Sequence, residues 1–394
     1  MVRPFRGQYS LDVFMRDYWQ KRPLILQGAF KKSSFNINRS DILKMAVSAE
    51  FDSRLIEEDT ADQSWELFTG PFEWEELESF EGLSHWTLLV QDTERELDQM
   101  RELLELFRFI PNWRLDDVQL SYAAPGGSVG PHVDSYDVFL IQLSGERRWK
   151  IENAPITDDR PMRKDASMHL LKELHPDQEF VAKPGDMLYL PPKLPHWGIA
   201  EGTCITASIG FKAPEMGMLQ TAFSEMIGGF GHIHTPSKFV DPVELRTGDP
   251  GRVSDASLDW FQNEMRRLAE DRESLERVFC SAMTHPVREN WPGMAKDPVP
   301  SAEEIPHDLR QGSTYVRLTP SCMVYREFDD CIRIYALGIE CQLKLESKPF
   351  AQLLTGTEIL NFDSLKSYLW DQEALELMQL LLDSMVLIRV EGSN

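Results

Sequence analysis

The feature that most constrains the fold is a stretch from about residue 117 to residue 211, where short apolar runs are separated by turns. The turn residues are Pro125-Gly126-Gly127, Ser144-Gly145, Pro184-Gly185-Asp186 and Pro191-Pro192. Short apolar segments bounded by Gly and Pro at this spacing are typical of an all-β barrel or sandwich. We therefore predict a β barrel or sandwich in the first half of the chain.

The residues before this stretch alternate between helical and extended patterns. Ser10 is a candidate N-cap for a helix over 11–19, since apolar residues follow it at helical spacing. Pro23 ends that helix, and residues 24–26 read as a strand. Further helices are predicted over 40–48 and 94–109. The first 213 residues therefore form one α+β unit around the barrel.

The chain after the barrel divides into three parts. Residues 214–285 have a helical pattern, with apolar residues such as Leu258, Phe261, Leu268 and Leu275. Residues 286–306 are rich in proline and read as a linker. Residues 307–394 combine strands near 315–318, 332–336, 342–345 and 386–390 with a helix over 373–382. We expect a small α+β module there.

A candidate metal site lies in the barrel at Pro131-His132-Val133-Asp134. Residues two apart in a strand point to the same face, so His132 and Asp134 can aim an imidazole and a carboxylate at one point. His196 follows a Pro-Gly-Asp turn and an apolar strand and supplies a second imidazole. Two histidines and one carboxylate leave open positions on a metal, as non-haem iron(II) oxygenases require. His232-Ile233-His234 has similar spacing without a third ligand, so we predict a surface loop.

Two arginines after the Ser144-Gly145 turn differ in strand parity. Arg147 shares a face with Trp149 and Ile151, which predicts an inward guanidinium, whereas Arg148 points outward. A buried guanidinium needs an anionic partner, and a dicarboxylate cosubstrate supplies one with bidentate geometry. A structural Arg–carboxylate pair is the alternative. The hydroxyls of Ser121, Thr206 and Ser208 suit either a cosubstrate cavity or an ordinary strand face.

Composition limits the partners of the chain. The net charge is −23 and the sequence has no Lys/Arg-rich run, so we expect no direct nucleic-acid binding and favour a basic protein partner. The same charge could serve solubility alone. The five cysteines form no CxxC pair, which argues against a disulfide framework or a zinc–thiolate site. The sequence shows no membrane span and no signal peptide, so we expect a cytoplasmic protein.

These residues together resemble the JmjC-type branch of the cupin superfamily, and within it the bacterial ribosomal oxygenases. The resemblance covers nearly the whole chain. It is carried by residues 18–23, 52–55, 113–117, 125–139 and 184–192, and by His196. Members of this group hydroxylate an arginine of a large-subunit ribosomal protein.

The resemblance implies a double-stranded β-helix with helical decoration, a helical dimerisation region and a C-terminal winged-helix-like module. It implies that His132, Asp134 and His196 bind Fe(II) and that Ser121 and Arg147 hold 2-oxoglutarate. It also implies a homodimer and a basic ribosomal substrate, large-subunit protein sixteen. Enterobacterial relatives carry Asn at the position of Thr206, which leaves a cosubstrate contact there in doubt.

Three other interpretations stay open at this point. A cupin metalloenzyme that does not use 2-oxoglutarate would have the same ligands but would not need an inward Arg147. A non-catalytic acidic scaffold that binds ribosomal proteins would explain the charge without turnover. Demethylation is a close relative of hydroxylation, because a hydroxylated N-methyl carbon is lost as formaldehyde. The neighbouring Asp116, Asp117, Tyr136 and Asp137 are candidates for the substrate channel or for plain structural roles.

Overall fold

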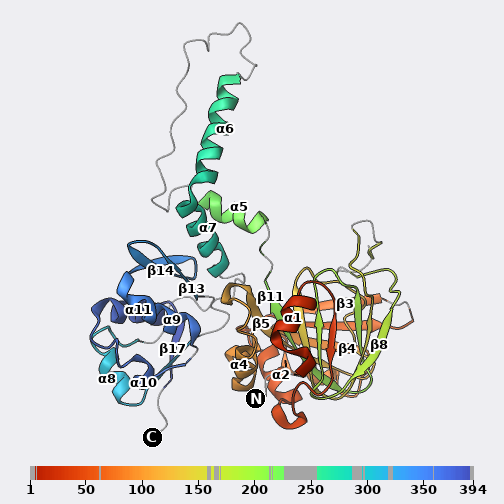
Figure 1. Ribbon diagram of the computed structural model, residues 1–394. Coiled ribbons are helices and arrows are strands. Elements are labelled where there is room, and N and C mark those ends of the chain that lie inside the picture. The colour runs from red at the N-terminus through yellow and green to blue at the C-terminus, as the bar shows by residue number, and fades with distance from the viewer. Residues whose placement is uncertain are drawn as a thin grey trace.

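A computed structural model gives the structure of the chain (Figure 1). It describes residues 5, 7–61, 64–157, 161–163, 168, 170–212, 214, 216–225, 255–285, 295, 298–317, 323–357 and 359–390. A β-rich body carries the N-terminal helices on one side. A helical region and a C-terminal module lie beside that body.

Two antiparallel sheets form the β-rich body and confirm the predicted barrel. The larger sheet has eight strands in the order β1 (Leu24–Leu26), β9 (Met187–Leu190), β6 (Asp137–Ser144), β11 (Cys204–Phe211), β5 (Leu115–Ala123), β4 (Trp86–Val90), β2 (Ser53–Asp59) and β3 (Ser64–Thr69). The smaller sheet has the order β10 (His196–Ala200), β7 (Arg147–Ile151) and β8 (Gln178–Ala182). The fold is a cupin-type double-stranded β-helix.

The strands of the larger sheet bury different residues on their two faces. On β6, Phe139, Ile141 and Leu143 pack into the core beneath the N-terminal helices. Val138 and Leu140 instead pack against the smaller sheet. The alternation explains why nearly every residue of β6 is buried, as expected for a strand covered on both faces. It also identifies which side chains face the interior between the sheets.

Helices cover the outer face of the larger sheet. They are α1 (Leu11–Asp17), α2 (Arg39–Ala46), α3 (Trp74–Ser79) and α4 (Asp98–Glu105), with 3₁₀ turns η1 (Gly7–Tyr9), η2 (Lys32–Ser34), η3 (Thr93–Arg95) and η4 (Asn112–Arg114). Ser10 caps α1 as predicted, since its side chain accepts a hydrogen bond from the Val13 amide. Helix α2 begins at Arg39 with Asn38 as its cap.

The single helix predicted over 94–109 was wrong. The chain forms η3, breaks, and then forms α4, because η3 is fixed to β5 by its side chains. Thr93 Oγ1 donates to the Val118 carbonyl at 2.7 Å, and Glu94 Oε2 accepts from the Val118 amide at 2.9 Å. Glu94 is fully buried against β5 and does not continue into α4.

The helical region contains α5 (Met216–Glu225), α6 (Asp255–Glu270) and α7 (Arg272–Thr284). Figure 1 shows α6 extending away from the body, with α5 packed beside α7. Leu258 and Phe261 on α6 are more than half exposed. The predicted loop at His232–His234 lies outside the described residues.

The C-terminal module has its own core and matches the predicted α+β character. Its strands are β12 (Thr314–Arg317), β13 (Met323–Glu327), β14 (Cys331–Ala336), β15 (Ile339–Lys344), β16 (Ile359–Leu360) and β17 (Leu387–Val390). Its helices are α8 (Ile305–Arg310), α9 (Lys348–Gly356), α10 (Phe362–Leu365) and α11 (Gln372–Asp383), with the 3₁₀ turn η7 (Leu345–Ser347). Pro306, which the prediction counted in the linker, lies in the first turn of α8, where proline fits.

The short turn η4 contacts the C-terminal module and the helical region and leads into the β-rich body. Asn112 Nδ2 donates to the Thr355 carbonyl of the C-terminal module at 2.6 Å. The Trp113 ring meets Phe279 of α7 edge-on, with ring centroids 5.3 Å apart. Strand β5 begins directly after η4. None of the described helices combines the length and apolar character that a membrane span requires.

Candidate metal centre

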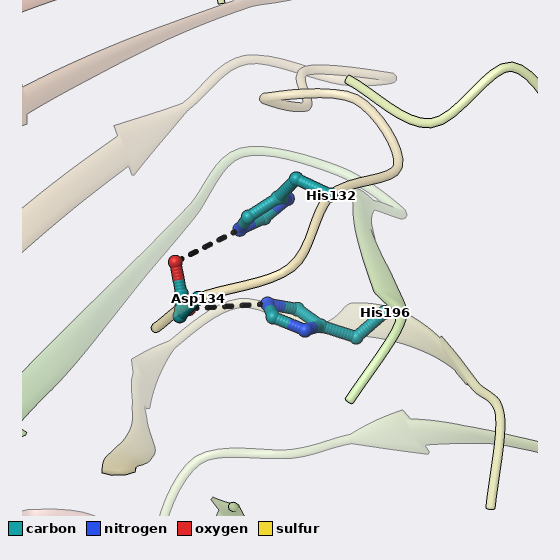
Figure 2. A group of neighbouring side chains, drawn as sticks. All are labelled: His132, Asp134 and His196. Carbon is teal, nitrogen blue, oxygen red and sulfur yellow. Dashed lines mark ion pairs between the residues drawn. The ribbon is translucent and has the colours of Figure 1, made fainter. Parts of the chain in front are cut away.

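The structure brings His132, Asp134 and His196 together at one end of the space between the sheets (Figure 2). One ligand atom from each residue lies within 4.8 Å of the other two. Asp134 Oδ2 is 3.5 Å from His196 Nε2, and Asp134 Oδ1 is 3.9 Å from His132 Nε2. In the described part of the chain, no other group of three or more His, Cys, Asp or Glu residues has this geometry.

The local backbone differs from the predicted strand. His132 forms an isolated bridge with His196, through His132 N to His196 O and His196 N to His132 O at 3.0 Å each. Residues 133–136 are irregular, and β6 starts at Asp137. The Asp134 carbonyl accepts from the Lys193 amide at 2.7 Å, which holds the loop against the segment that leads to His196. The convergence of the ligands therefore depends on pairing between two segments rather than on strand parity alone.

Hydrogen bonds fix the tautomer of both histidines. His132 Nδ1 donates to the Gly130 carbonyl and His196 Nδ1 donates to the Leu194 carbonyl, each at 2.9 Å. Because a carbonyl only accepts, each Nδ1 must carry the proton. The lone pair of each ring is then on Nε2, the atom that faces Asp134. Metal-binding histidines are commonly oriented by such a bond.

Burial keeps His196 uncharged. It is 3% exposed, and its burial, together with the nearby His132, lowers the pKa of His196 to about 4. Desolvation disfavours the charged imidazolium. A neutral imidazole is the form that binds a metal. The three side chains therefore fit a divalent ion with an N₂O donor set and open coordination positions, as non-haem iron sites have.

Arg147 faces the interior, as its parity predicts. The residue is 5% exposed, and its Nε and Nη2 atoms are buried without a hydrogen-bond partner. Its strand neighbours Trp149 and Ile151 pack in the core between the sheets. A buried guanidinium without an anion is unfavourable, so the interior beside Arg147 suits a carboxylate ligand.

Ser121 and Thr206 also face the interior. They are direct partners on β5 and β11, and both are almost fully buried. Ser121 Oγ donates to the Thr206 carbonyl at 3.3 Å, a long bond that a ligand can replace. Thr206 Oγ1 donates to Gln142 Oε1 at 3.0 Å. Gln142 was not identified as a site residue from the sequence. It could have been, because Gln142 is a polar residue on the same strand face as Val138 and Leu140.

The four candidates for the substrate channel differ in burial and in contacts; they are Asp116, Asp117, Tyr136 and Asp137. Asp137 is fully buried, accepts from Tyr189 Oη at 2.6 Å and pairs with Arg114 at 3.0 Å, so it is structural. Asp117 is buried and accepts from the Asp92 amide at 3.1 Å. The Tyr136 ring is 39% exposed. The charge of Asp134, burial, and then the charges of Asp117 and Asp116 raise the pKa of Tyr136 above its ordinary value.

The chain is similar to known proteins over most of its length. A family model of the JmjC domain matches residues 102–219. The "Ribosomal protein uL16 3-hydroxylase" of Escherichia coli is 30% identical over 383 residues, covering 94% of this chain and 95% of that protein. The "Probable ribosomal oxygenase" of Haemophilus influenzae is 29% identical over 336 residues, covering 83% of this chain and 81% of that protein.

Solved structures of a bacterial ribosomal oxygenase have the same fold as this chain. The Escherichia coli ribosomal oxygenase YcfD in complex with cobalt and 2-oxoglutarate superposes with a TM-score of 0.79 at 27% identity, covering 98% of this chain and 99% of that one. An X-ray structure of the same protein gives a TM-score of 0.81 over 98% of this chain. A double-stranded β-helix with this cluster of ligands is the architecture of the JmjC class. Within that class, the chain belongs to the ribosomal oxygenase family.

Proposed function

We propose that this chain is an Fe(II)- and 2-oxoglutarate-dependent protein hydroxylase. His132, Asp134 and His196 would hold the metal, and Arg147 and Ser121 would hold the distal carboxylate of 2-oxoglutarate. The observation that carries the proposal is the buried Arg147 guanidinium without a partner in the same interior as the three ligands. The complex of the relative YcfD with cobalt and 2-oxoglutarate supports it.

The residues of the chain would place the reactants and keep water away. Bound together, Fe(II) and 2-oxoglutarate supply the oxidant that hydroxylates a C–H bond, with dioxygen as oxygen source and succinate and carbon dioxide as coproducts. The neutral His196 and the oriented His132 give the metal its nitrogen donors. Arg147 fixes one end of the cosubstrate by a charge-assisted bond, and the apolar wall around Trp149 excludes solvent.

Two of the three alternatives from the sequence, the cupin enzyme without 2-oxoglutarate and the non-catalytic scaffold, explain less of the site. A cupin enzyme without 2-oxoglutarate gives no reason for a buried Arg147 with two unpartnered nitrogens. A non-catalytic scaffold gives no reason for three oriented ligands whose lone pairs converge. The cupin alternative predicts that 2-oxoglutarate does not bind, and the scaffold alternative predicts that no succinate forms. A binding measurement together with a turnover assay therefore separates both from the proposed function.

We propose an arginine of a basic ribosomal protein, uL16, as the substrate. The name of the Escherichia coli relative gives the protein, and it favours hydroxylation over demethylation. The net charge of −23 attracts a cationic partner. The exposed Tyr136 ring can stack on a guanidinium. Asp116, whose side chain is one-third exposed and lies 3.7 Å from Lys212 Nζ, can pair with the guanidinium as well. The enzyme would act in the cytoplasm.

We also propose that residues 214–285 pair two chains and that residues 307–394 form a winged-helix-like module. A cavity of about 720 Å³ lies between α5, α7, β13 and η4, and apolar side chains line most of it, including Leu219, Phe223 and Phe279. Exposed apolar residues on α6 offer a matching surface on a second copy. A monomer rarely leaves so much apolar surface open to water.

The test is incubation of the protein with Fe(II), 2-oxoglutarate and uL16 in air, followed by mass spectrometry of the ribosomal protein. The proposal predicts the gain of one oxygen atom on an arginine, with succinate formed only when all components are present. Modification of another residue type would overturn the substrate. Failure of 2-oxoglutarate to bind the metal-loaded protein would overturn the chemistry.

A further inference from the structure

Both histidine ligands of the candidate metal centre are on segments that pair with each other imperfectly. Residues 126–132 run antiparallel to β10, with bonds from Gly126 N to Ala200 O, from Ala200 N to Gly127 O, and in both directions between His132 and His196. Bridges join Ser128 to Ile199 and His132 to His196. Three residues, 129–131, therefore lie opposite two, 197–198. This is a β-bulge directly beside the metal ligands.

The Ser128 side chain spans this bulge. Its Oγ accepts a hydrogen bond from Trp197 Nε1 at 2.6 Å and another from the Gly130 amide at 2.9 Å. Ser128 is fully buried. The two donors come from opposite sides of the bulge, one directly after His196 and one two residues before His132. One oxygen atom therefore connects the two segments at the point where their backbone ladder is interrupted.

The Gly130 peptide passes this restraint on to the metal ligand. Its amide is held by Ser128, and its carbonyl accepts from His132 Nδ1. Gly130 has a positive φ of 79°, and a Cβ atom there would lie 3.0 Å from a Leu170 methyl group. The Gly130 nitrogen and carbonyl oxygen belong to consecutive peptide groups that share the Gly130 Cα atom. A shift of the nitrogen is therefore passed to the oxygen that orients the His132 ring.

We infer that Ser128 is a positioning residue of the metal centre, which sets the separation of His132 and His196 across the bulge. This inference rests on the proposed metal-dependent function. Removing the hydroxyl leaves the buried Gly130 amide and the partly buried Trp197 indole without their acceptor, a state that favours rearrangement of the bulge. Outer partners of metal ligands typically change metal affinity by about 10- to 100-fold when they are removed.

The test is the dissociation constant for Mn(II), measured anaerobically by electron paramagnetic resonance on the full chain. Ser128→Ala is expected to bind Mn(II) about 10- to 100-fold more weakly than the wild type. Trp197→Phe keeps an aromatic ring and loses the indole donor but leaves the Ser128–Gly130 bond, so it should weaken binding less. The two substitutions should be non-additive, because each removes the same hydrogen bond.

Ser313→Ala is the matched control. Ser313 is also buried, and its hydroxyl also bridges two groups, Asp308 and Arg389, but it lies in the C-terminal module. This control should lower thermal stability without changing the Mn(II) constant. Wild-type affinity in Ser128→Ala would overturn the inference. If that variant does not fold, wild-type affinity in Trp197→Phe would overturn it. Failure of the wild type to bind Mn(II) would instead overturn the proposed function.

Discussion

Arg147 and Arg148 are consecutive residues of β7, yet they point to opposite faces of the smaller sheet. Arg147 is 5% exposed and its Nε and Nη2 atoms have no partner. Arg148 lies on the outer face, where it pairs with Glu179 at 2.8 Å and Glu201 at 2.5 Å. Only one of two chemically identical side chains can therefore meet a ligand between the sheets.

This pair gives a matched test of cosubstrate binding. Arg147→Ala should weaken 2-oxoglutarate binding to the Mn(II)-loaded protein by about 2–5 kcal/mol, because it removes a buried charge-assisted contact. Arg148→Ala removes only solvent-exposed ion pairs and should leave the dissociation constant unchanged. Calorimetric titration measures both. Equal losses in the two variants would refute the inward role of Arg147.

The metal ligands give the second prediction. The protein should bind one Fe(II) or Mn(II) ion per chain, and His132→Ala or Asp134→Ala should abolish succinate production. Each substitution removes one of only three protein ligands. Metal analysis and a coupled succinate assay measure the two effects. Full turnover in either variant would show that the ion is bound elsewhere.

Strand parity predicted which side chains of this site face the interior where the backbone is a regular strand, and it was insufficient where the backbone is irregular. Parity assigned Arg147 and Arg148 correctly, because β7 is a regular strand paired on both sides. Parity was insufficient at His132 and Asp134, where a bulge and an irregular loop set the geometry. The role of Ser128 depends on a contact with Trp197, far along the chain, which no local pattern encodes. Glu94 left its predicted helix because of a similar distant contact, with Val118.

Glu94 leads to a prediction about stability and pH. Burial, and then the charges of Asp92 and Asp117, raise the pKa of Glu94 above its ordinary value of 4.5. The folded state then holds this proton more tightly than the unfolded chain. The free energy of unfolding should therefore fall as the pH rises above about 4.5.

Glu94→Gln tests this prediction, because glutamine keeps the acceptor for the Val118 amide and cannot ionise. The variant should gain stability relative to the wild type as the pH rises, and the difference should disappear at acidic pH. Urea unfolding at several pH values measures it. A constant difference across the pH range would show that Glu94 does not titrate in the folded protein.

The assembly prediction concerns α6. Phe261→Asp should convert the proposed dimer to a monomer, because Phe261 is 55% exposed in one chain and would be buried in the pair. Trp370→Asp is the control, since Trp370 is 84% exposed but lies in the C-terminal module. Light scattering at micromolar concentration gives the mass. A monomeric wild type would contradict the proposed dimer.

The most direct test of the account is the origin of the oxygen atom in the product. The enzyme, Fe(II), 2-oxoglutarate and uL16 are incubated under isotopically heavy dioxygen, and the ribosomal protein is then fragmented in a mass spectrometer. The proposed function predicts one heavy oxygen on an arginine carbon and one succinate for each modified protein. An arginine that stays unmodified while 2-oxoglutarate is bound, or an oxygen that comes from water, would contradict it.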